Sequence, residues 1–293
     1  SAIALSKIAE SFKKTCYVVF PIEQVNSSLE KGLNLLKKNE IIVNFKKYKE
    51  ILEVINDNTL LIVLVTQKPY LVENPELLDK INDIFVIDHH TNSSEHIDNT
   101  IFEYINSNKS SIVEIIAEYL KYLNKTLNPI IITLLSAGME IDTNSFSLKT
   151  TENTFKMAGF LTRLGADPIL RKEILKESKD DVIRRHDYIK NSYFIKEGYL
   201  LCDMGEKDIN DPVDLAILAD ELLRFDTVEV SFAVGKIGLD MVGVSPRPMG
   251  KISAAVLMSP IGGGGHVTDA AAQFKGKNNK EVIEMIKKVV MEG

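Results

Sequence analysis

The chain of 293 residues is long enough for about two domains, and its 45% hydrophobic and 26% charged residues are those of an ordinary globular protein. A formal net charge of −6 argues against binding to duplex nucleic acid, but it is compatible with a small phosphorylated ligand held by local basic groups. Only two cysteines, no apolar stretch of about 20 residues and no signal-peptide pattern predict a cytoplasmic protein without disulfides or a membrane span.

The first ninety residues predict alternating helices and strands. Apolar positions 4, 5, 8 and 9 share one face of a helix over residues 1–10. The alternation that follows favours a mostly parallel sheet with helices on both faces. The further elements expected here are a strand at 16–20, a helix at 27–38, a short strand at 41–43, a helix at 45–56, a strand at 60–65, a loop at 66–69, a helix at 76–81 and a strand at 85–87.

Helices dominate the next part of the chain. Ser111 and Glu114 match a capping box, which explains Ser110 and Ser111 at least as well as ligand contact does. Asp142 is expected in a loop, and Gly165 is expected to end a helix. The elements expected in this part are helices at 111–123, 129–138, 150–164 and 168–176.

A charged helix at 180–191 is expected to connect two domains, with His186 exposed to solvent. A turn at 197–198 precedes the strands and helices of the second domain. They are a strand at 199–202, a helix at 213–223, strands at 228–234 and 241–244, and a helix that includes the alanines at 270–272.

The first candidate site follows the apolar run 85–87, which is typical of a strand covered on both faces. Asp88, His89 and His90 come directly after it, at the end where parallel sheets place ligand-binding groups. Carboxylate and imidazole groups suit Mn²⁺, Mg²⁺ or Zn²⁺. On spacing alone, a His pair at a surface turn explains the motif about equally well.

The second candidate site is Gly262, Gly263, Gly264 and Gly265, followed by His266. Four consecutive glycines cost backbone entropy, and close approach of backbone N–H groups to a phosphate, with a helix behind them, would explain them. The alternative is a flexible linker. A linker is not usually followed by a histidine and an alanine-rich run.

The two motifs, in this order, resemble the DHH phosphoesterase family with its DHH-associated C-terminal domain. Other stretches resemble the soluble catalytic region of the membrane-anchored cyclic-di-AMP phosphodiesterases of bacteria, and the resemblance covers nearly the whole chain. These stretches are residues 66–72, 86–90, 137–146, 165–167 and 245–250.

The resemblance implies an α/β fold, in which a mostly parallel sheet flanked by helices is joined by a smaller α/β domain across a cleft. We expect a DHH phosphoesterase domain at 1–178, a connecting helix at 179–193 and a DHH-associated substrate-binding domain at 194–293. We also expect Asp88, His89, Asp142 and His266 to converge on the cleft.

The function implied by the resemblance is that of a Mn-dependent hydrolase in bacterial signalling, a phosphodiesterase for cyclic-di-AMP or a related cyclic dinucleotide. His89 and Asp142 are the expected metal ligands, and Asp88 either ligates or orients His89. Asp88, His89 and His90 are expected to be catalytic, with His90 either ligating the metal or contacting phosphate. The expected substrate-binding residues are Arg247, Gly262, Gly263, Gly264, Gly265 and His266.

Departures from the family pattern predict impaired catalysis. The family's first motif, a His and two Asp residues, lies on a loop before a helix like residues 1–10, so we expect its ligands to be missing here. Val65 stands where the family carries an Asp that bridges two Mn ions, so at most one weakly held Mn is expected. Thr91 and Asn92 replace basic residues, and an Asn usual near Ser253 is missing. Val65 itself is expected to pack at the end of its strand.

Other functions are compatible with these residues. The chain could be a degenerate protein that binds nucleotide without cutting it, or a nuclease or phosphatase for short oligonucleotides such as linear dinucleotides. A purely structural relic is least favoured, because His266 and the four glycines remain. A homodimer, and in relatives a membrane tether upstream of the catalytic region, are further expectations.

Overall fold

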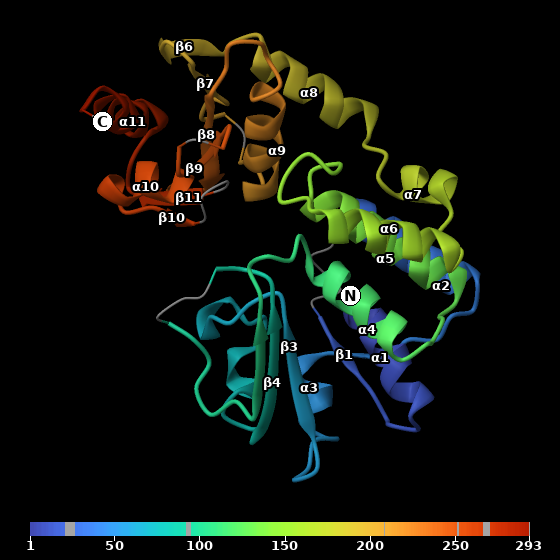
Figure 1. The fold of residues 1–293 in the computed structure, drawn as a ribbon. Coiled ribbons are helices and arrows are strands. Elements are labelled where there is room, and N and C mark those ends of the chain that lie inside the picture. Colours follow the sequence, from blue (N-terminus) through green and yellow to red (C-terminus); the bar gives the residue numbers. More distant parts are fainter. Residues whose placement is uncertain (21–26, 92–94, 208, 251, 266–269, 293) are drawn as a thin grey trace. The chain divides into compact units, whose positions relative to one another are not determined.

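The computed structural model describes residues 1–20, 27–91, 95–207, 209–250, 252–265 and 270–292 (Figure 1). The chain divides into two compact units, Ser1–Glu177 and Ser178–Gly293. None of the helices described is both long enough and apolar enough to cross a lipid bilayer.

The first unit contains two parallel sheets. Strands β3 (Leu60–Leu64), β4 (Asp83–Asp88) and β5 (Phe102–Ile105) pair in the order β3-β4-β5, with β4 in the middle. Strands β1 (Val18–Val19) and β2 (Phe45–Lys46) form a separate two-stranded sheet. The expected parallel α/β architecture is therefore confirmed.

The helices of this unit form most of its core. Helices α1, α4, α5 and α6 bury their apolar faces in one cluster that includes Ala117, Met139 and Leu161. Figure 1 shows α5 and α6 side by side. The helices are α1 (Ala2–Ser11), α2 (Ser27–Lys38), α3 (Tyr48–Ile51), α4 (Ile112–Tyr122), α5 (Pro129–Asp142), α6 (Glu152–Arg163) and α7 (Pro168–Ile174), with 3₁₀ turns η1 (Pro69–Leu71) and η2 (Pro75–Leu77).

The predicted helix ends around α4 and α6 are confirmed. Ser111 accepts a hydrogen bond from the Glu114 amide at 3.1 Å and so caps α4. Gly165 has a φ of +103°, the left-handed conformation that glycine allows after a helix.

Four predictions for this unit are wrong. No strand forms at 41–43, and the helix expected at 45–56 is a short strand followed by the four residues of α3. The helix expected at 76–81 is the 3₁₀ turn η2. Helix α5 continues to Asp142, which we had expected in a loop. Local apolar patterns are ambiguous in such short segments, so tertiary packing decides them.

The second unit is built on one six-stranded sheet. Its order is β10-β11-β9-β8-β7-β6, and only β7 and β8 pair in parallel. The turn at 197–198 precedes β7 as predicted. The strand β6 before this turn was not predicted. The strands are β6 (Tyr193–Lys196), β7 (Tyr199–Asp203), β8 (Val230–Gly238), β9 (Met241–Pro248), β10 (Gly264–Gly265) and β11 (Ala270–Lys275).

Helices cover both faces of this sheet (Figure 1). One core cluster joins the sheet to α9, with residues of α8 packed against it, and a second joins it to α10 and α11. Arg185 on α8 is buried, and its Nε lies 3.1 Å from Glu221 on α9, whereas His186 is exposed as predicted. The helices are α8 (Lys179–Ile189), α9 (Pro212–Leu222), α10 (Ala254–Met258) and α11 (Asn279–Glu292), with the 3₁₀ turn η3 (Ser259–Ile261).

The predicted alanine-rich helix after the glycines is wrong. Ala270 and Ala272 belong to β11, and Ala272 pairs with Val244 of β9. Both alanines are buried and Ala271 between them is exposed, which is the two-residue period of a strand. Pairing with β9 thus overrides the helix propensity of alanine.

Candidate functional site

Strand β4 carries the Asp-His-His motif to the carboxyl edge of the parallel sheet. Its apolar residues Ile84 and Val86 are buried between flanking elements, and Asp88 is its last residue, only 1% exposed. A buried carboxylate is costly unless donors surround it. The burial of Asp88 therefore requires hydrogen-bond donors around its carboxylate.

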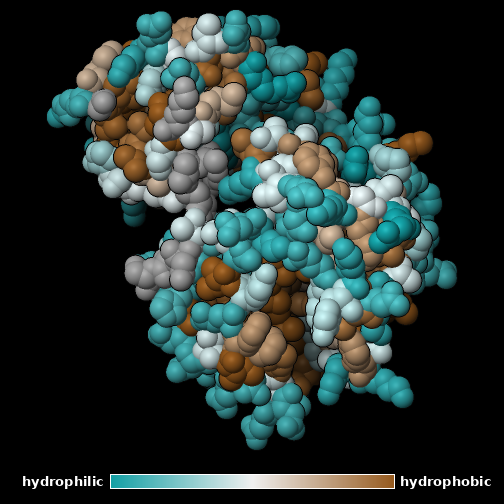
Figure 2. Space-filling view, viewed as in Figure 1, coloured by the Kyte–Doolittle hydropathy of each residue, from teal (hydrophilic) through white to brown (hydrophobic). Residues whose placement is uncertain are grey.

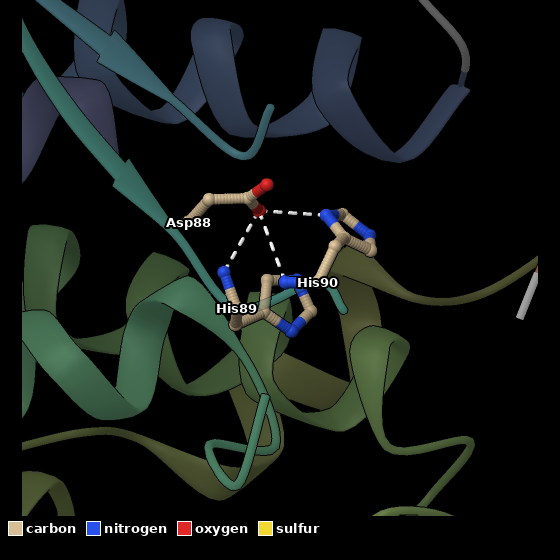
Figure 3. Close-up of side chains that lie close together, drawn as sticks. All are labelled: Asp88, His89 and His90. Atoms are coloured by element: carbon tan, nitrogen blue, oxygen red, sulfur yellow. Dashed lines mark hydrogen bonds and ion pairs between the residues drawn. The ribbon is translucent and has the colours of Figure 1, made fainter. Parts of the chain in front are cut away.

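The motif itself supplies most of these donors (Figure 3). Oδ1 of Asp88 accepts the backbone N–H groups of His89 at 2.8 Å and His90 at 3.2 Å. The same oxygen lies 2.7 Å from Nδ1 of His90. Burial opposes the charged carboxylate, but these contacts outweigh it and hold the pKa of Asp88 below its usual range. Asp88 thus orients His90, whereas its contact with His89 is to the backbone.

Gln67 is a further member of this site that the sequence did not single out. Its side chain is buried, and Nε2 lies 3.3 Å from Oδ2 of Asp88 and 3.1 Å from the Thr91 carbonyl. Gln67 follows β3, the neighbour of β4. Since parallel strands end at the same edge of the sheet, the loop at 66–69 could have been expected to reach Asp88.

The His89 ring is buried and neutral at physiological pH. Burial and the neighbouring charge of His90 lower the pKa of His89 to about 4, with Lys149 adding to the effect and Asp88 opposing it. Nδ1 of His89 is buried and makes no hydrogen bond to any described residue. A neutral imidazole with a buried nitrogen lacking a partner suits a metal ion, because metals bind the unprotonated ring.

Asp88, His89 and His90 form a cluster able to hold a cation. Each offers one ligand atom, and these atoms lie within 4.8 Å of one another. The mixed carboxylate and imidazole set, together with the unsatisfied nitrogen of His89, fits a divalent transition ion. The motif is therefore not a pair of histidines exposed at a turn.

Asp142 lies at the end of α5, near this cluster but not among its closest ligand atoms. Asp142 is exposed as a whole residue, yet the protein atoms around its carboxyl oppose the charge and raise its pKa to about 6. The Ser1 amino group, His90 and Lys149 act in the opposite direction. The last turn of a helix disfavours a carboxylate as well, which leaves Asp142 ready to be stabilised by a cation.

Val65 does not pack into the sheet, contrary to the prediction. Strand β3 ends at Leu64, and Val65 follows with a φ of +71° and 40% exposure. Its amide donates to the Ile87 carbonyl at 3.0 Å, so the residue sits beside the end of β4. A β-branched residue in the left-handed region is a strained outlier, and such strain costs on the order of 1–3 kcal/mol. Apolar side chains at the surface of this unit are visible in Figure 2.

A buried carboxylate, Glu114, fixes the chain just before α4. It is 1% exposed and accepts from the Ser110 amide at 3.1 Å, from the Ser110 hydroxyl at 2.7 Å and from Thr154 at 3.0 Å. Ser111 therefore caps α4 as predicted, but the predicted capping box is not formed, because the Glu114 carboxylate accepts from Ser110 and not from the Ser111 amide. A hydrogen bond with the backbone of Lys109, in the same segment, acts to raise the pKa of His89.

In the second unit, Arg247 is held by its own neighbours. Its Nε lies 3.2 Å from Asp220, and its Nη1 donates to Ser245 at 3.0 Å and to the Pro246 carbonyl at 2.9 Å. Its guanidinium is therefore fixed in one orientation. A phosphate at this position would share it with Asp220.

In the glycine motif, Gly263 is tightly packed, whereas Gly264 has open space around it. A Cβ on Gly263 would lie 2.7 Å from Met258 and 2.8 Å from Ala272, so no side chain fits there. Gly262 has a φ of +80°, and a Cβ on Gly264 would meet nothing within 4 Å. His266 lies outside the described residues, as do 267–269.

The comparisons match both halves of this architecture. The family model described as "DHH family, N-terminal domain" matches residues 1–139, and the "DHHA1 domain" model matches residues 193–292. This chain belongs to the DHH family. Over 297 aligned residues the DHH chain is 36% identical to "Cyclic-di-AMP phosphodiesterase GdpP" of Bacillus subtilis (strain 168), covering all of this chain and 45% of that protein. The chain thus spans under half the length of this curated relative.

Solved structures share the fold of this DHH chain. An "exopolyphosphatase-related protein" from Bacteroides fragilis superposes with a TM-score of 0.75 at 15% identity, over 100% of this chain and 96% of that one. RecJ of Thermus thermophilus, solved in complex with Mn²⁺, superposes with a TM-score of 0.57 at 14% identity, over 100% of this chain and 54% of RecJ. At these identities the likeness is one of fold.

Proposed function

We propose that this DHH protein is a metal-dependent phosphodiesterase whose substrate is cyclic-di-AMP or a related cyclic dinucleotide. The observation that carries the proposal is the cluster of Asp88, neutral His89 and His90 at the carboxyl end of β4. The identity of 36% to a cyclic-di-AMP phosphodiesterase over the whole chain supports the substrate class.

The residues of the site have different roles in binding a cation. His89 binds it through its unprotonated ring, and Asp142 adds a carboxylate whose ionisation the cation favours. Asp88 keeps His90 in place, which makes it an orienting group as well as a possible ligand. A bound divalent ion neutralises phosphoryl charge and lowers the pKa of a water. We propose Mn²⁺, because carboxylate and imidazole suit it and the RecJ structure contains it.

Several residues are proposed to contact phosphate oxygens. His90 is partly exposed, and Lys149 adds a positive charge that is close enough to affect both His89 and Asp142. In the second unit, the proposed substrate-binding residues are Arg247, Gly262, Gly263, Gly264, Gly265 and His266. The glycines would bind through backbone groups, and a Cβ on Gly263 would overlap Met258 and Ala272.

We further propose that turnover is weak while Val65 occupies the turn after β3. A second cation next to the first needs bridging anions, because two divalent ions repel each other strongly. Val65 offers no ligand, and it lies next to the end of β4 where a carboxylate would reach the cluster. The chain is therefore expected to bind one Mn²⁺ ion.

The test is hydrolysis of cyclic-di-AMP and of a linear adenine dinucleotide at saturating Mn²⁺, by the unchanged chain, Val65→Asp and Val65→Asn. We expect slow metal-dependent cleavage that only Val65→Asp accelerates, and a higher kcat/KM for the cyclic substrate. Asn matches the shape of Asp and relieves the same backbone strain, so it isolates the carboxylate.

Three results would change the proposal. Full activity in the unchanged chain would remove the role given to Val65. A large kcat/KM advantage for the linear dinucleotide would reassign the substrate to short oligonucleotides. Tight dinucleotide binding with no cleavage by any variant would identify a nucleotide-binding protein.

A further inference from the structure

The turn after α5 is strained in a way that needs an explanation. Asn144, Ser145 and Phe146 have φ values of +44°, +56° and +63°, three consecutive left-handed residues without a glycine. Left-handed backbone is unfavourable at every such L-residue. Buried Thr143 compensates by accepting the Phe146 amide at 3.0 Å, and the Ser145 amide donates to the Glu140 carbonyl at 2.8 Å. The fold therefore fixes this turn in place, and strain of this kind clusters at functional sites.

The strained turn presents an aromatic pair. Phe146 packs against the core of the first unit, and its ring stacks on Phe155 of α6 with centroids 5.8 Å apart and an interplanar angle of 21°. Phe155 is 59% exposed. A large exposed aromatic ring backed by a second, anchored ring makes a rigid platform, and nucleobases stack on such rings whatever their sequence.

The aromatic pair borders a cavity of about 580 Å³ that is widely open to solvent. Its volume lies within the roughly 300–1,000 Å³ of small-molecule sites. Its wall combines the two rings with hydroxyl, amide and ammonium groups, as a site for a base and its phosphate requires. The groups that matter are Ser107, Asn108, Phe146, Lys149, Thr150 and Phe155.

Lys149 connects this cavity with the Asp-His-His cluster. It lines the cavity, and its positive charge acts on both His89 and Asp142. Because a charge acts more weakly at a greater distance, Lys149 lies near the cluster as well as in the wall of the cavity. A phosphate near the cluster and a base in the cavity would thus both be close to this lysine.

We propose that the cavity is a nucleobase subsite, in which Phe155 stacks on one base of the dinucleotide and Lys149 pairs with the phosphate attached to it. The subsite rests on the proposed function, because it takes the phosphodiester to lie at Asp88, His89 and His90. It adds a specificity determinant on α6 that the Asp-His-His motif does not contain.

The test compares two probes, AMP and ribose 5-phosphate, by calorimetry on the full chain. The unchanged protein is expected to bind AMP more tightly than ribose 5-phosphate, since only AMP carries a base. Phe155→Ala is expected to weaken AMP binding by about five- to a hundredfold and to leave ribose 5-phosphate unchanged, because stacking contributes to the base alone. Phe155→Tyr, which keeps the ring, is expected to retain AMP affinity.

Phe12→Ala is the matched control. Phe12 is 49% exposed, next to the last residue of α1, and packs under Lys125. The opposite end of α1 carries Ser1, whose amino group acts on Asp142. The ten residues of α1 place Phe12 about 15 Å further away, so its removal should leave AMP binding unchanged.

The outcomes separate the subsite from the proposed function. Equal affinities for the two probes, or AMP binding that survives Phe155→Ala, would overturn the subsite. Cyclic-di-AMP turnover with unaltered KM in Phe155→Ala would overturn it as well and leave the phosphodiesterase proposal intact. Ring-dependent AMP binding in a protein without any metal-dependent cleavage would support the subsite and overturn the phosphodiesterase proposal.

Discussion

Nδ1 of His90 lies 2.7 Å from Oδ1 of Asp88, the same oxygen that accepts the backbone amides of His89 and His90. One carboxylate oxygen therefore organises the whole motif, and the other faces Gln67. Because Asp88 already serves several donors, His89 is the residue of the motif with coordinating capacity to spare: its Nδ1 is buried without a partner among the described residues.

The backbone of Val65 predicts a stability gain on substitution. Val65→Asn should raise the free energy of unfolding by about 1 kcal/mol, because Asn tolerates the left-handed conformation and Val does not. Urea unfolding measures the change. Val213, exposed on α9, is the control, since Val213→Asn relieves no positive φ and should bring no gain. A loss of stability in Val65→Asn would contradict the strain at this position.

Asp142 predicts a pH dependence of stability without metal. Its pKa is about 6 in the folded protein against an ordinary value of 3.8. Between these pH values the folded state therefore binds a proton that the unfolded state has lost. Asp142 alone should therefore lower the free energy of unfolding as the pH rises from about 4 to about 6. His89, whose pKa is lowered from 6.5 to about 4, acts in the opposite direction over nearly the same range. Relative to the unchanged protein, Asp142→Asn should therefore gain stability as the pH rises from about 4 to about 6, and it should be the more stable of the two at pH 7.

Thermal unfolding from pH 4 to pH 7 in the presence of a chelator measures the effect. Asp57→Asn, at an exposed loop position, serves as the control and should keep the original pH dependence. If Asp142→Asn followed the same curve as the unchanged protein, another group would be responsible.

Glu114 predicts a large loss on truncation. Glu114→Ala should lower the free energy of unfolding by about 3 kcal/mol, because it leaves the buried amide and hydroxyl of Ser110 and the hydroxyl of Thr154 without their acceptor. Denaturant titration measures it. Glu152→Ala, which breaks an exposed pair with Lys156, should change stability far less than Glu114→Ala does. Similar losses in both variants would refute the special role of Glu114.

The four glycines predict two separable effects. Gly263→Ala should destabilise the second unit by roughly 1–3 kcal/mol, since its Cβ would overlap Met258 and Ala272. Gly264→Ala meets nothing and should leave stability nearly unchanged. Thermal unfolding of both variants, paired with AMP binding, distinguishes packing from ligand contact. Equal stability of the two variants would contradict the close packing at Gly263.

The sequence predicted the elements that rest on strong local patterns. The apolar run before Asp88 predicted β4, because a strand buried on both faces has no polar residue in its middle. Helix α2 begins and ends at the expected residues. The candidate site at Asp88, His89 and His90 was also predicted, and its cluster geometry agrees with a metal site.

Features set by tertiary contacts were not predictable in this way. The loop at 66–69 was expected after β3, but the contact of Gln67 with Asp88 depends on the pairing of β3 with β4. The left-handed backbone at Val65 could not be predicted, because a β-branched residue rarely adopts this conformation. Ala272 became part of a strand because β9 offers a partner edge, which local helix propensity does not report.

The binding of a divalent cation by His89 is tested most directly by Mn²⁺ titration calorimetry of the unchanged chain, His89→Ala and His186→Ala. His186 is exposed on α8 and outside the cluster, so it controls for the loss of a histidine. We predict that Mn²⁺ binds the unchanged chain and His186→Ala with the same affinity, and His89→Ala on the order of 10–100-fold more weakly. Equal Mn²⁺ affinity in all three proteins would contradict the account.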